Sequence, residues 1–506
     1  MEEKIKQAIE NIAKNLEVHK EYIRFDNTEQ IYIIEDYLNN KIIEIKKNIK
    51  FDNLIDYPLK FYYCDFLETV IGRNKTFKEK IIFEEVVFCK VVNFSFSIFD
   101  KNINFSNVKF EDKLYFDKCQ FKEKFEFFGI NNLKAEFNSS HFKKEVYFGK
   151  EITDKNVEKS NSFGSCSFEY ANFSNCHFKK EVYFKNNDFK QVFFRNSKFN
   201  NNIHFNNSIF KDYADFHECE FEKTANFYRV RFDKTPNFSQ AIFKGNLNVV
   251  NTNLNFTFDD LQERIKQEYA FYETQRTAKE AGVIPNLYQE KSLDKFANDF
   301  RDSFRIFKNA LIKDNNLLDA SNFHKYELYC KEIELKNKKG KTFKDVVDRW
   351  QLLFYRKLCD HHTNLILNLK WFIVIVGFFT SILFGLRYGD GNLMQFFNKD
   401  SDLLKMLKNI LNIKALNDSN ATYLILLYSF IGLFFVRTFF IFYYLVIFIL
   451  MLAISPYNLF TMINFAIRHE TNSFLENIII IIYTLSIVLI IFSLQKTARK
   501  NSIVPS

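Results

Sequence analysis

The sequence predicts a β-solenoid that is flanked by helices and followed by a helical membrane domain. Three observations carry this prediction. Phenylalanine recurs at steps of five and six residues over much of the first half, a small or apolar residue stands two positions before most of these rings, and long uncharged runs fill the last third. The 506 residues include 64 Phe but only 12 Gly and 5 Pro, so hairpins with Gly or Pro turns do not explain the Phe-rich part.

The spacing is clearest in the stretch FKEKIIFEEVVFCKVVNFSFSIFDKNINF, which runs from Phe77 to Phe105. A helix would scatter these rings, because a step of five turns it by about 140° and a step of six by about 240°. A flat strand also fails, because a step of five changes the face and a step of six keeps it. A chain that turns a corner after each unit directs every ring to one axis, and self-similarity over this length indicates a solenoid.

The predicted core of the solenoid consists of the recurring phenylalanines. The core residues that we predict are Phe83, Phe88, Phe94, Phe99, Phe105, Phe110, Phe116, Phe121, Phe173, Phe178, Phe184, Phe189, Phe199, Phe205, Phe210, Phe216, Phe221 and Phe227. Cys119, Cys166, Cys176 and Cys219 share the small position two residues before a Phe. We interpret these four as buried small hydrophobes, with a metal or redox role as the alternative.

Because two positions recur together over roughly Phe77–Phe243, the chain resembles the pentapeptide-repeat family, whose units have a central Phe or Leu and a small residue two before it. The resemblance implies a right-handed quadrilateral β-helix with four units per coil. The alternating units depart from the family pattern. Two units of five residues and two units of six residues give about 22 residues per coil rather than 20. We expect about seven coils and a rod of roughly 34 Å.

The composition changes along the chain indicate four parts. These are an N-terminal helical cap at 1–76, the solenoid at 77–256 with an unpatterned insertion at about 149–162, a charged helical connector at 257–369 and a membrane domain at 370–506.

Both flanks of the solenoid carry helical periodicity. EEKIKQAIENIAKNL and TEQIYIIEDYLNNKIIEIKK are typical of amphipathic helices, which either cover the first coil or form a partner-binding arm. After the repeats, Thr257 and Asp260 suggest a capping box. The connector is similar to a helical module that joins pentapeptide repeats to membrane helices in some bacterial proteins, and Arg305, Lys308 and Glu327 are among the residues that carry this resemblance.

The membrane domain is predicted to contain four spans, with three as the alternative. We place the spans at about 370–387, 421–436, 438–455 and 476–495. Trp371 and Tyr388 suit the two interfaces of the first span, and Arg437 would lie at the cytoplasmic face between the second and third. Basic residues before the first span and after the last favour a cytoplasmic location for both ends, which requires an even number of spans.

No motif in the sequence predicts catalytic, cofactor-binding or metal-binding residues, because it contains no GxxxxGK[ST], HExxH or Gly-rich dinucleotide loop. The run CDHH at 359–362, alone or together with His324, offers metal-ligand side chains, but its spacing fits no common site and we interpret it as a solvated turn. YGDG at 388–391 shares three letters with a potassium-channel filter, and we interpret it as an interfacial turn. Eight Cys without a CxxC pair, and a charged N-terminus without a signal peptide, indicate reduced thiols.

We therefore predict a non-enzymatic scaffold of the bacterial inner membrane, multi-pass and with its solenoid in the cytoplasm. Its partners would be the lipid bilayer and a protein on the solenoid surface, and a homo-oligomer remains open. The alternative is an ion channel or transport protein in which the solenoid regulates or assembles the membrane part. Acidic and basic residues nearly balance over the repeats, so neither DNA mimicry nor nucleic-acid binding is favoured.

Overall fold

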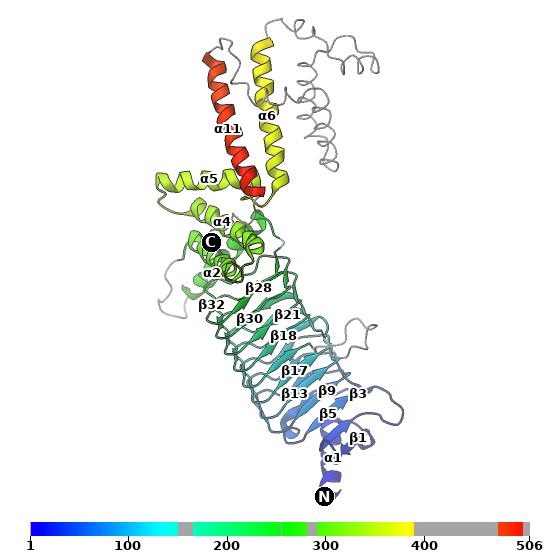
Figure 1. The fold of residues 1–506 in the computed structure, drawn as a ribbon. Coiled ribbons are helices and arrows are strands. Elements are labelled where there is room, and N and C mark those ends of the chain that lie inside the picture. The colour runs from blue at the N-terminus through cyan, green and yellow to red at the C-terminus, as the bar shows by residue number, and fades with distance from the viewer. Residues whose placement is uncertain (1, 150–164, 255, 281–290, 389–473, 499–506) are drawn as a thin grey trace, which may run out of the picture. The chain divides into compact units, whose positions relative to one another are not determined.

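The structure is a computed structural model that describes residues 2–149, 165–254, 256–280, 291–388 and 474–498 (Figure 1). The chain divides into two compact units, Met1–Arg349 and Trp350–Pro505. The predicted insertion at 149–162, apart from its first residue, and the predicted spans at 421–436 and 438–455 lie outside the described residues.

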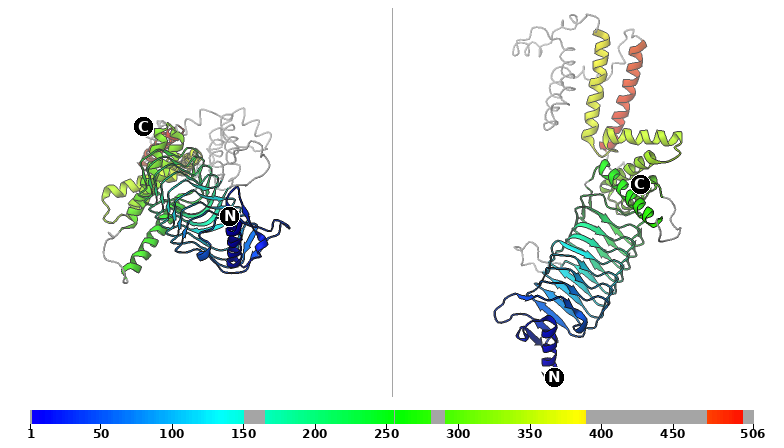
Figure 2. Two further views of the ribbon diagram at one scale, coloured as in Figure 1. Left: turned by 90° about the horizontal axis from the view of Figure 1, so that it is seen from below. Right: turned by 180° about the vertical axis from the view of Figure 1, so that it is seen from behind.

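The first unit is built on short strands that stack in coils (Figure 2), and in the described residues these strands form four sheets. The first sheet contains β1 (Ile23–Asp26), β2 (Ile31–Ile34), β5 (Leu59–Tyr62), β9 (Ile81–Glu84), β13 (Ile103–Ser106), β17 (Phe125–Phe128), β20 (Val146–Phe148), β23 (Val182–Tyr183), β26 (Ile203–His204), β30 (Ala225–Asn226) and β33 (Leu247–Asn248). The second contains β3 (Ile43–Ile45), β6 (Cys64–Phe66), β10 (Val87–Phe88) and β14 (Lys109–Phe110).

The other two sheets complete the coils. The third contains β4 (Ile49–Lys50), β7 (Val70–Ile71), β11 (Val92–Asn93), β15 (Leu114–Tyr115), β18 (Leu133–Glu136), β21 (Ser167–Asn172), β24 (Asp188–Phe193), β27 (Ile209–Phe210), β31 (Arg231–Phe232) and β34 (Asn253–Leu254), with β28 (Ala214–Asp215) paired to β24. The fourth contains β8 (Thr76–Phe77), β12 (Ile98–Phe99), β16 (Gln120–Phe121), β19 (His141–Phe142), β22 (His177–Phe178), β25 (Lys198–Phe199), β29 (Glu220–Phe221) and β32 (Ile242–Phe243).

The strand register sets the length of each coil. Phe99 on β12 pairs with Phe121 on β16, which is a spacing of 22 residues. Their rings stack 5.2 Å apart and only 4° from parallel. Farther along, Phe178 pairs with Phe199, so some coils contain 21 residues. The predicted core phenylalanines are all buried, and all of them except Phe94 stack on a ring of the coil before.

The corners explain why units of five and six alternate. Most described five-residue steps contain one residue with a positive φ, such as Phe96 (66°) between Phe94 and Phe99 and Asn107 (52°) after Phe105. In the described chain the six-residue steps contain none. A left-handed residue makes the tight corner possible, while the extra residue of a longer unit lets the chain turn in ordinary conformations.

The N-terminal prediction is wrong in its second half. Helix α1 (Glu2–Leu16) forms, but the stretch expected to be a second amphipathic helix contains strands β2 and β3. All four residues of β2 are buried, because the strand pairs with β1 on one side and β5 on the other. Tertiary pairing of β-branched residues therefore overrides the helical periodicity of this stretch. The 3-10 turns η1 (Lys20–Tyr22) and η2 (Phe51–Asn53) connect these elements.

The solenoid consequently begins before residue 77 and has about nine turns rather than seven. Phe61 and Phe66 already pair with Phe83 and Phe88 at the full coil spacing. The early coils were hidden because Gly72 stands where the pattern requires Phe, and a Cβ at Gly72 would lie 2.5 Å from the Phe94 ring. At about 4.8 Å per turn, nine turns make a rod of roughly 43 Å.

Helices cover the far end of the solenoid within the first unit (Figure 1). They are α2 (Phe258–Glu280), α3 (Leu293–Lys313) and α4 (Leu317–Asn337). Phe307 on α3 places its ring 4.7 Å from the ring of Phe238 and 6.4 Å from that of Phe227. This side chain continues the aromatic column beyond the last coil, so the connector is also the C-terminal cap.

A network of two cations and a histidine around Glu327 joins α3 to α4. Lys308 donates to its carboxylate at 2.7 Å, Arg305 at 2.9 Å, and the His324 ring lies at 3.4 Å. Burial alone would raise the pKa of Glu327, but these hydrogen bonds outweigh it and hold the pKa at about 2.

The second unit contains the end of α5 (Phe343–Cys359), which begins in the first unit, together with α6 (Leu365–Tyr388) and α11 (Phe474–Ala498). The predicted spans at 370–387 and 476–495 fall within α6 and α11.

Truncating one ring of the column will destabilise the solenoid. We expect Phe205→Ala to lower the free energy of unfolding by about 3–5 kcal/mol, because it leaves a cavity between stacked rings. Urea unfolding of the full chain, followed by far-ultraviolet circular dichroism, measures the change. The exposed Lys223→Ala in the same region is the control and should change stability by less than about 0.5 kcal/mol. If both variants lowered the free energy of unfolding equally, the claim that the stacked rings stabilise the solenoid would be contradicted.

The Glu327 network predicts a pH-dependent stability. Its folded pKa lies below the unfolded value, so its stabilisation is present above about pH 4.5 and disappears as the pH falls towards 2. We expect Glu327→Gln to cost about 2–3 kcal/mol at pH 7 and clearly less at pH 3. Thermal unfolding at both pH values tests this, with the exposed Asp314→Asn as control. A cost that does not depend on pH would contradict the ionic role of Glu327.

Candidate functional site

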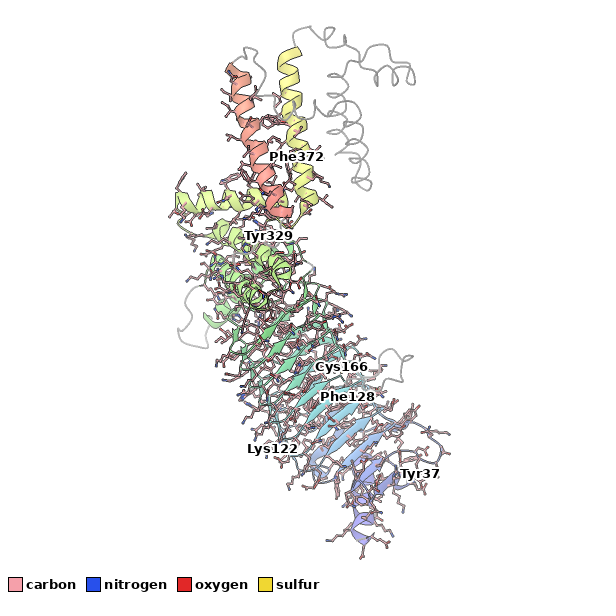
Figure 3. The ribbon with its side chains drawn as sticks, viewed as in Figure 1. Tyr37, Lys122, Phe128, Cys166, Tyr329 and Phe372 are labelled. Atoms are coloured by element: carbon pink, nitrogen blue, oxygen red, sulfur yellow. The ribbon has the colours of Figure 1, made fainter. Side chains whose placement is uncertain are left out.

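Helices α6 and α11 form an antiparallel pair. Val376 on α6 packs with Tyr483 and Ile487 on α11, while Phe372, one turn earlier on α6, packs against Ile490, farther along α11. Figure 3 shows Phe372 between the two helices. Because early residues of α6 contact late residues of α11, the start of α6 and the end of α11 lie at the same end of the pair.

The outer surface of α11 is apolar and exposed. The exposed large apolar side chains are Leu475, Ile478, Ile481, Ile482, Leu485, Val488, Leu489, Ile491 and Phe492. Only 28% of the most apolar window in Asn477–Ala498 is buried, and this described helix is long and apolar enough to cross a bilayer. The apolar stretch of α6, Leu365–Phe379, is shorter. A helix apolar on nearly all sides needs an apolar surrounding such as lipid.

A buried polar contact joins the two helices near their common end. The Asn368 amide donates to the Ser493 hydroxyl at 2.9 Å and to the Thr497 hydroxyl at 3.3 Å. The Nδ1 atom of His362 lies 3.3 Å from the same Thr497 hydroxyl. The sequence analysis missed this contact, although Ser493 and Thr497, four residues apart at the end of the last apolar run, were a signal for it.

The interface residues predicted from the sequence fall in different places. The indole of Trp371 donates to the carbonyl of Lys357 at 2.8 Å, so it ties the start of α6 to the end of α5. The Tyr388 side chain and Arg437 lie outside the described residues.

The CDHH run forms the turn between α5 and α6, but it is buried rather than solvated. Asp360, His361 and His362 have φ values of 50°, 54° and 67°, and both histidines are largely buried. Cys359 Sγ lies 3.5 Å from His362 Nδ1. His324 instead pairs with Glu327 on α4. Among the residues that the structure describes, no group of three His, Cys, Asp or Glu side chains could hold a metal ion.

A column of alternating Ser and Cys runs along one inner corner of the solenoid. Its members are Ser97, Cys119, Ser140, Cys176, Ser197 and Cys219, and each donates to a backbone carbonyl of the preceding coil. Cys219 Sγ, for example, lies 2.9 Å from the Phe194 carbonyl oxygen. Burial raises the pKa of Cys119 to about 12, so its thiol stays protonated at neutral pH. This arrangement uses the thiols as buried donors rather than as ligands or nucleophiles.

The coils of this chain have four sides, a central ring and a small residue two positions before that ring. These are the features of the family that the sequence resembles. The pentapeptide-repeat family model, described as nine copies of the repeat, matches residues 163–220 and 205–253. Residues 163–253 of the solenoid are therefore pentapeptide repeats. Neither a search of curated proteins nor a search of solved structures returned a match to the chain. Pentapeptide-repeat solenoids are generally structural or scaffold proteins.

The outside of the pentapeptide-repeat rod carries polar side chains in rows one coil apart. Asn196 donates to Asn175 at 3.0 Å, and Asn175 donates to Asn138 at 3.0 Å. On another row Lys198 contacts Glu220 at 2.9 Å. Two shallow hollows on this surface share Asn131, Asn132 and Glu169 among their lining residues. The exterior is therefore a fixed array of hydrogen-bonding and charged groups.

A charged cluster fixes α2 to the pentapeptide-repeat coils. Arg195 contacts both Asp215, which is fully buried, and Glu268 on α2. Tyr213 also donates to Glu268, and Arg264 lies 3.1 Å over the Tyr213 ring. Burial raises the pKa of Glu268, and the nearby Asp215 charge acts in the same direction. We interpret the cluster as a structural clamp, since its charges satisfy one another.

The buried column predicts the thiol reactivity of the folded protein. All eight cysteines are free and only Cys89 is partly exposed. We expect one fast thiol with Ellman's reagent at pH 8 and eight after denaturation. Cys89→Ser should remove the fast phase, whereas the matched Cys219→Ser should leave it unchanged. A second fast thiol in the native protein would show that the column is accessible.

Proposed function

We propose that this pentapeptide-repeat protein is a non-enzymatic scaffold, anchored in the bacterial inner membrane by α6, α11 and the predicted spans, with its rod in the cytoplasm. The observation that carries the anchoring is the exposed apolar surface of α11, opposite the face that packs on α6. In water such a surface would favour association, whereas in a bilayer it is matched to the lipid chains.

The antiparallel pairing supports an even number of spans. If α6 and α11 both cross the bilayer, the residue that precedes α6 and the residue that follows α11 emerge on one side. Basic residues lie near this end of the two helices in the sequence: Lys357 before α6, Lys370 early in α6 and Lys496 late in α11. Their charge favours the cytoplasmic side for this end. Four spans fit this parity and three do not.

The scaffold role is supported by the location of the polar and charged side chains, which lie on the outer surface of the rod. Stacked phenylalanines fill the axis, so the interior offers no site for a substrate. The polar rows on the outside repeat at a fixed interval of about 4.8 Å, as a protein-binding surface of a solenoid requires. We propose a protein partner on this surface, and recognition there rather than catalysis as its role.

Cysteine accessibility in membranes tests the anchoring and its parity. In a Cys89→Ser background, we expect Lys357→Cys and Lys496→Cys to react with an impermeant maleimide from the same side, in inverted vesicles and not in intact spheroplasts. Ile482→Cys, on the outer surface of α11, should react from neither side.

Two outcomes would contradict the proposal. Free aqueous labelling of Ile482→Cys in membranes would exclude lipid contact of α11, and labelling of the two lysine positions from opposite sides would exclude the even parity. Ion flux through liposomes that contain the purified full-length protein would instead make the membrane domain a pathway, and it would replace the anchor by a channel or transport protein.

A further inference from the structure

Helix α5 presents a row of large apolar side chains to the outside. Phe343, Val346, Val347, Trp350 and Phe354 follow the spacing i, i+3, i+4, i+7 and i+11, so they share one face of the helix. Their exposed fractions are 86%, 39%, 47%, 65% and 44%. Such a continuous row, with an exposed Trp at its centre, indicates a surface that is covered in the working protein.

The end of α5 is joined to the α6–α11 pair. Leu358 and Cys359, in its last turn, pack against Ile490 of α11. The Lys357 carbonyl accepts the hydrogen bond from the Trp371 indole. These contacts place the last turn of α5 at the end of the pair where the chain would enter the bilayer, and the apolar row ends one turn before Leu358.

The charges of α5 favour an anionic surface. The helix carries Lys344, Arg349, Arg356 and Lys357, against two acidic residues, Asp345 and Asp348. Asp345 is neutralised by Lys338, whose ammonium lies 2.9 Å from the carboxylate. An apolar row bordered by basic side chains is the pattern of helices that lie in the headgroup region of anionic membranes.

We propose that α5 is an interfacial helix, which lies in the cytoplasmic headgroup layer with Phe343, Trp350 and Phe354 inserted among anionic lipids. This inference rests on the proposed anchoring by α6 and α11, and adds a third contact with the membrane that does not cross it. Lipid fits the row better than a second protein does, because the border of the row is basic and the last turn of α5 packs on a helix whose outer surface is assigned to lipid.

The two tryptophans of the chain provide the test, since Trp350 and Trp371 are the only ones. Trp371→Phe leaves Trp350 as the sole emitter, and Trp350→Phe leaves Trp371. Each full-length variant is reconstituted into vesicles that contain anionic phosphatidylglycerol and lipids brominated either near the headgroup or near the chain ends. We expect shallow bromines to remove about half of the Trp350 emission and deep bromines much less, because an interfacial helix buries its apolar face by about 5–10 Å.

The outcomes separate the inference from the function on which it rests. If Trp371 is quenched by bromine and Trp350 is not, the anchoring stands and the interfacial helix is overturned. In that case, quenching of Trp350 by aqueous iodide would show that the apolar row of α5 is exposed to solvent. Protection of Trp350 from iodide would show that another protein or a second copy covers the row. If neither tryptophan is quenched by bromine, the anchoring itself fails. Trp350 quenching that is unchanged in purely zwitterionic vesicles would overturn the role of the basic border.

Discussion

The stacking of one coil on the next is the constraint on which the rest of the protein depends. A single coil cannot bury its own ring or pair its own backbone groups, so each coil requires a neighbour. Because the rings of neighbouring coils stack nearly parallel about 5 Å apart, the axis is filled and dry. The filled axis has two consequences: chemistry is confined to the outer surface, and both ends of the column must be covered. Phe307 of α3 covers the C-terminal end of the column, and α1 packs beside β1 at the N-terminal end.

The corners determine how regular the outer surface can be. A five-residue unit closes its corner with a left-handed residue, and a six-residue unit uses one more residue instead. Inside the corner, small donors such as Ser197 and Cys219 give a second hydrogen bond to buried carbonyls of the preceding coil, which already accept one from a backbone N–H. The coil can therefore lengthen or shorten by one residue without losing the ring column. The outer rows keep their spacing, as a display surface requires.

The second unit differs from the solenoid in where its apolar side chains lie. The solenoid buries its large apolar side chains, whereas the helices of the second unit expose many of theirs. Only one side of α11 is used for packing on α6, and the Asn368 contact with Ser493 fixes the register of the pair. A hydrogen bond between helices holds its geometry well where water is scarce. The same end of the pair receives the last turn of α5, so the helix register and the end of α5 are both fixed within a few residues of the CDHH turn.

The sequence by itself determined the solenoid, its aromatic axis and the apolar character of the C-terminal helices. These features are repeated locally, and a ring every five or six residues leaves the chain few other ways to bury them. The tertiary structure alone decided where the coils begin, because Gly72 interrupts the ring pattern and Ile45 occupies a ring position opposite Phe66. It also decided that Ile31–Ile34 is a strand, since only β1 and β5 reveal that all four side chains are buried. The contact of Asn368 with Ser493 joins residues 125 positions apart, and no local period can encode such a distance.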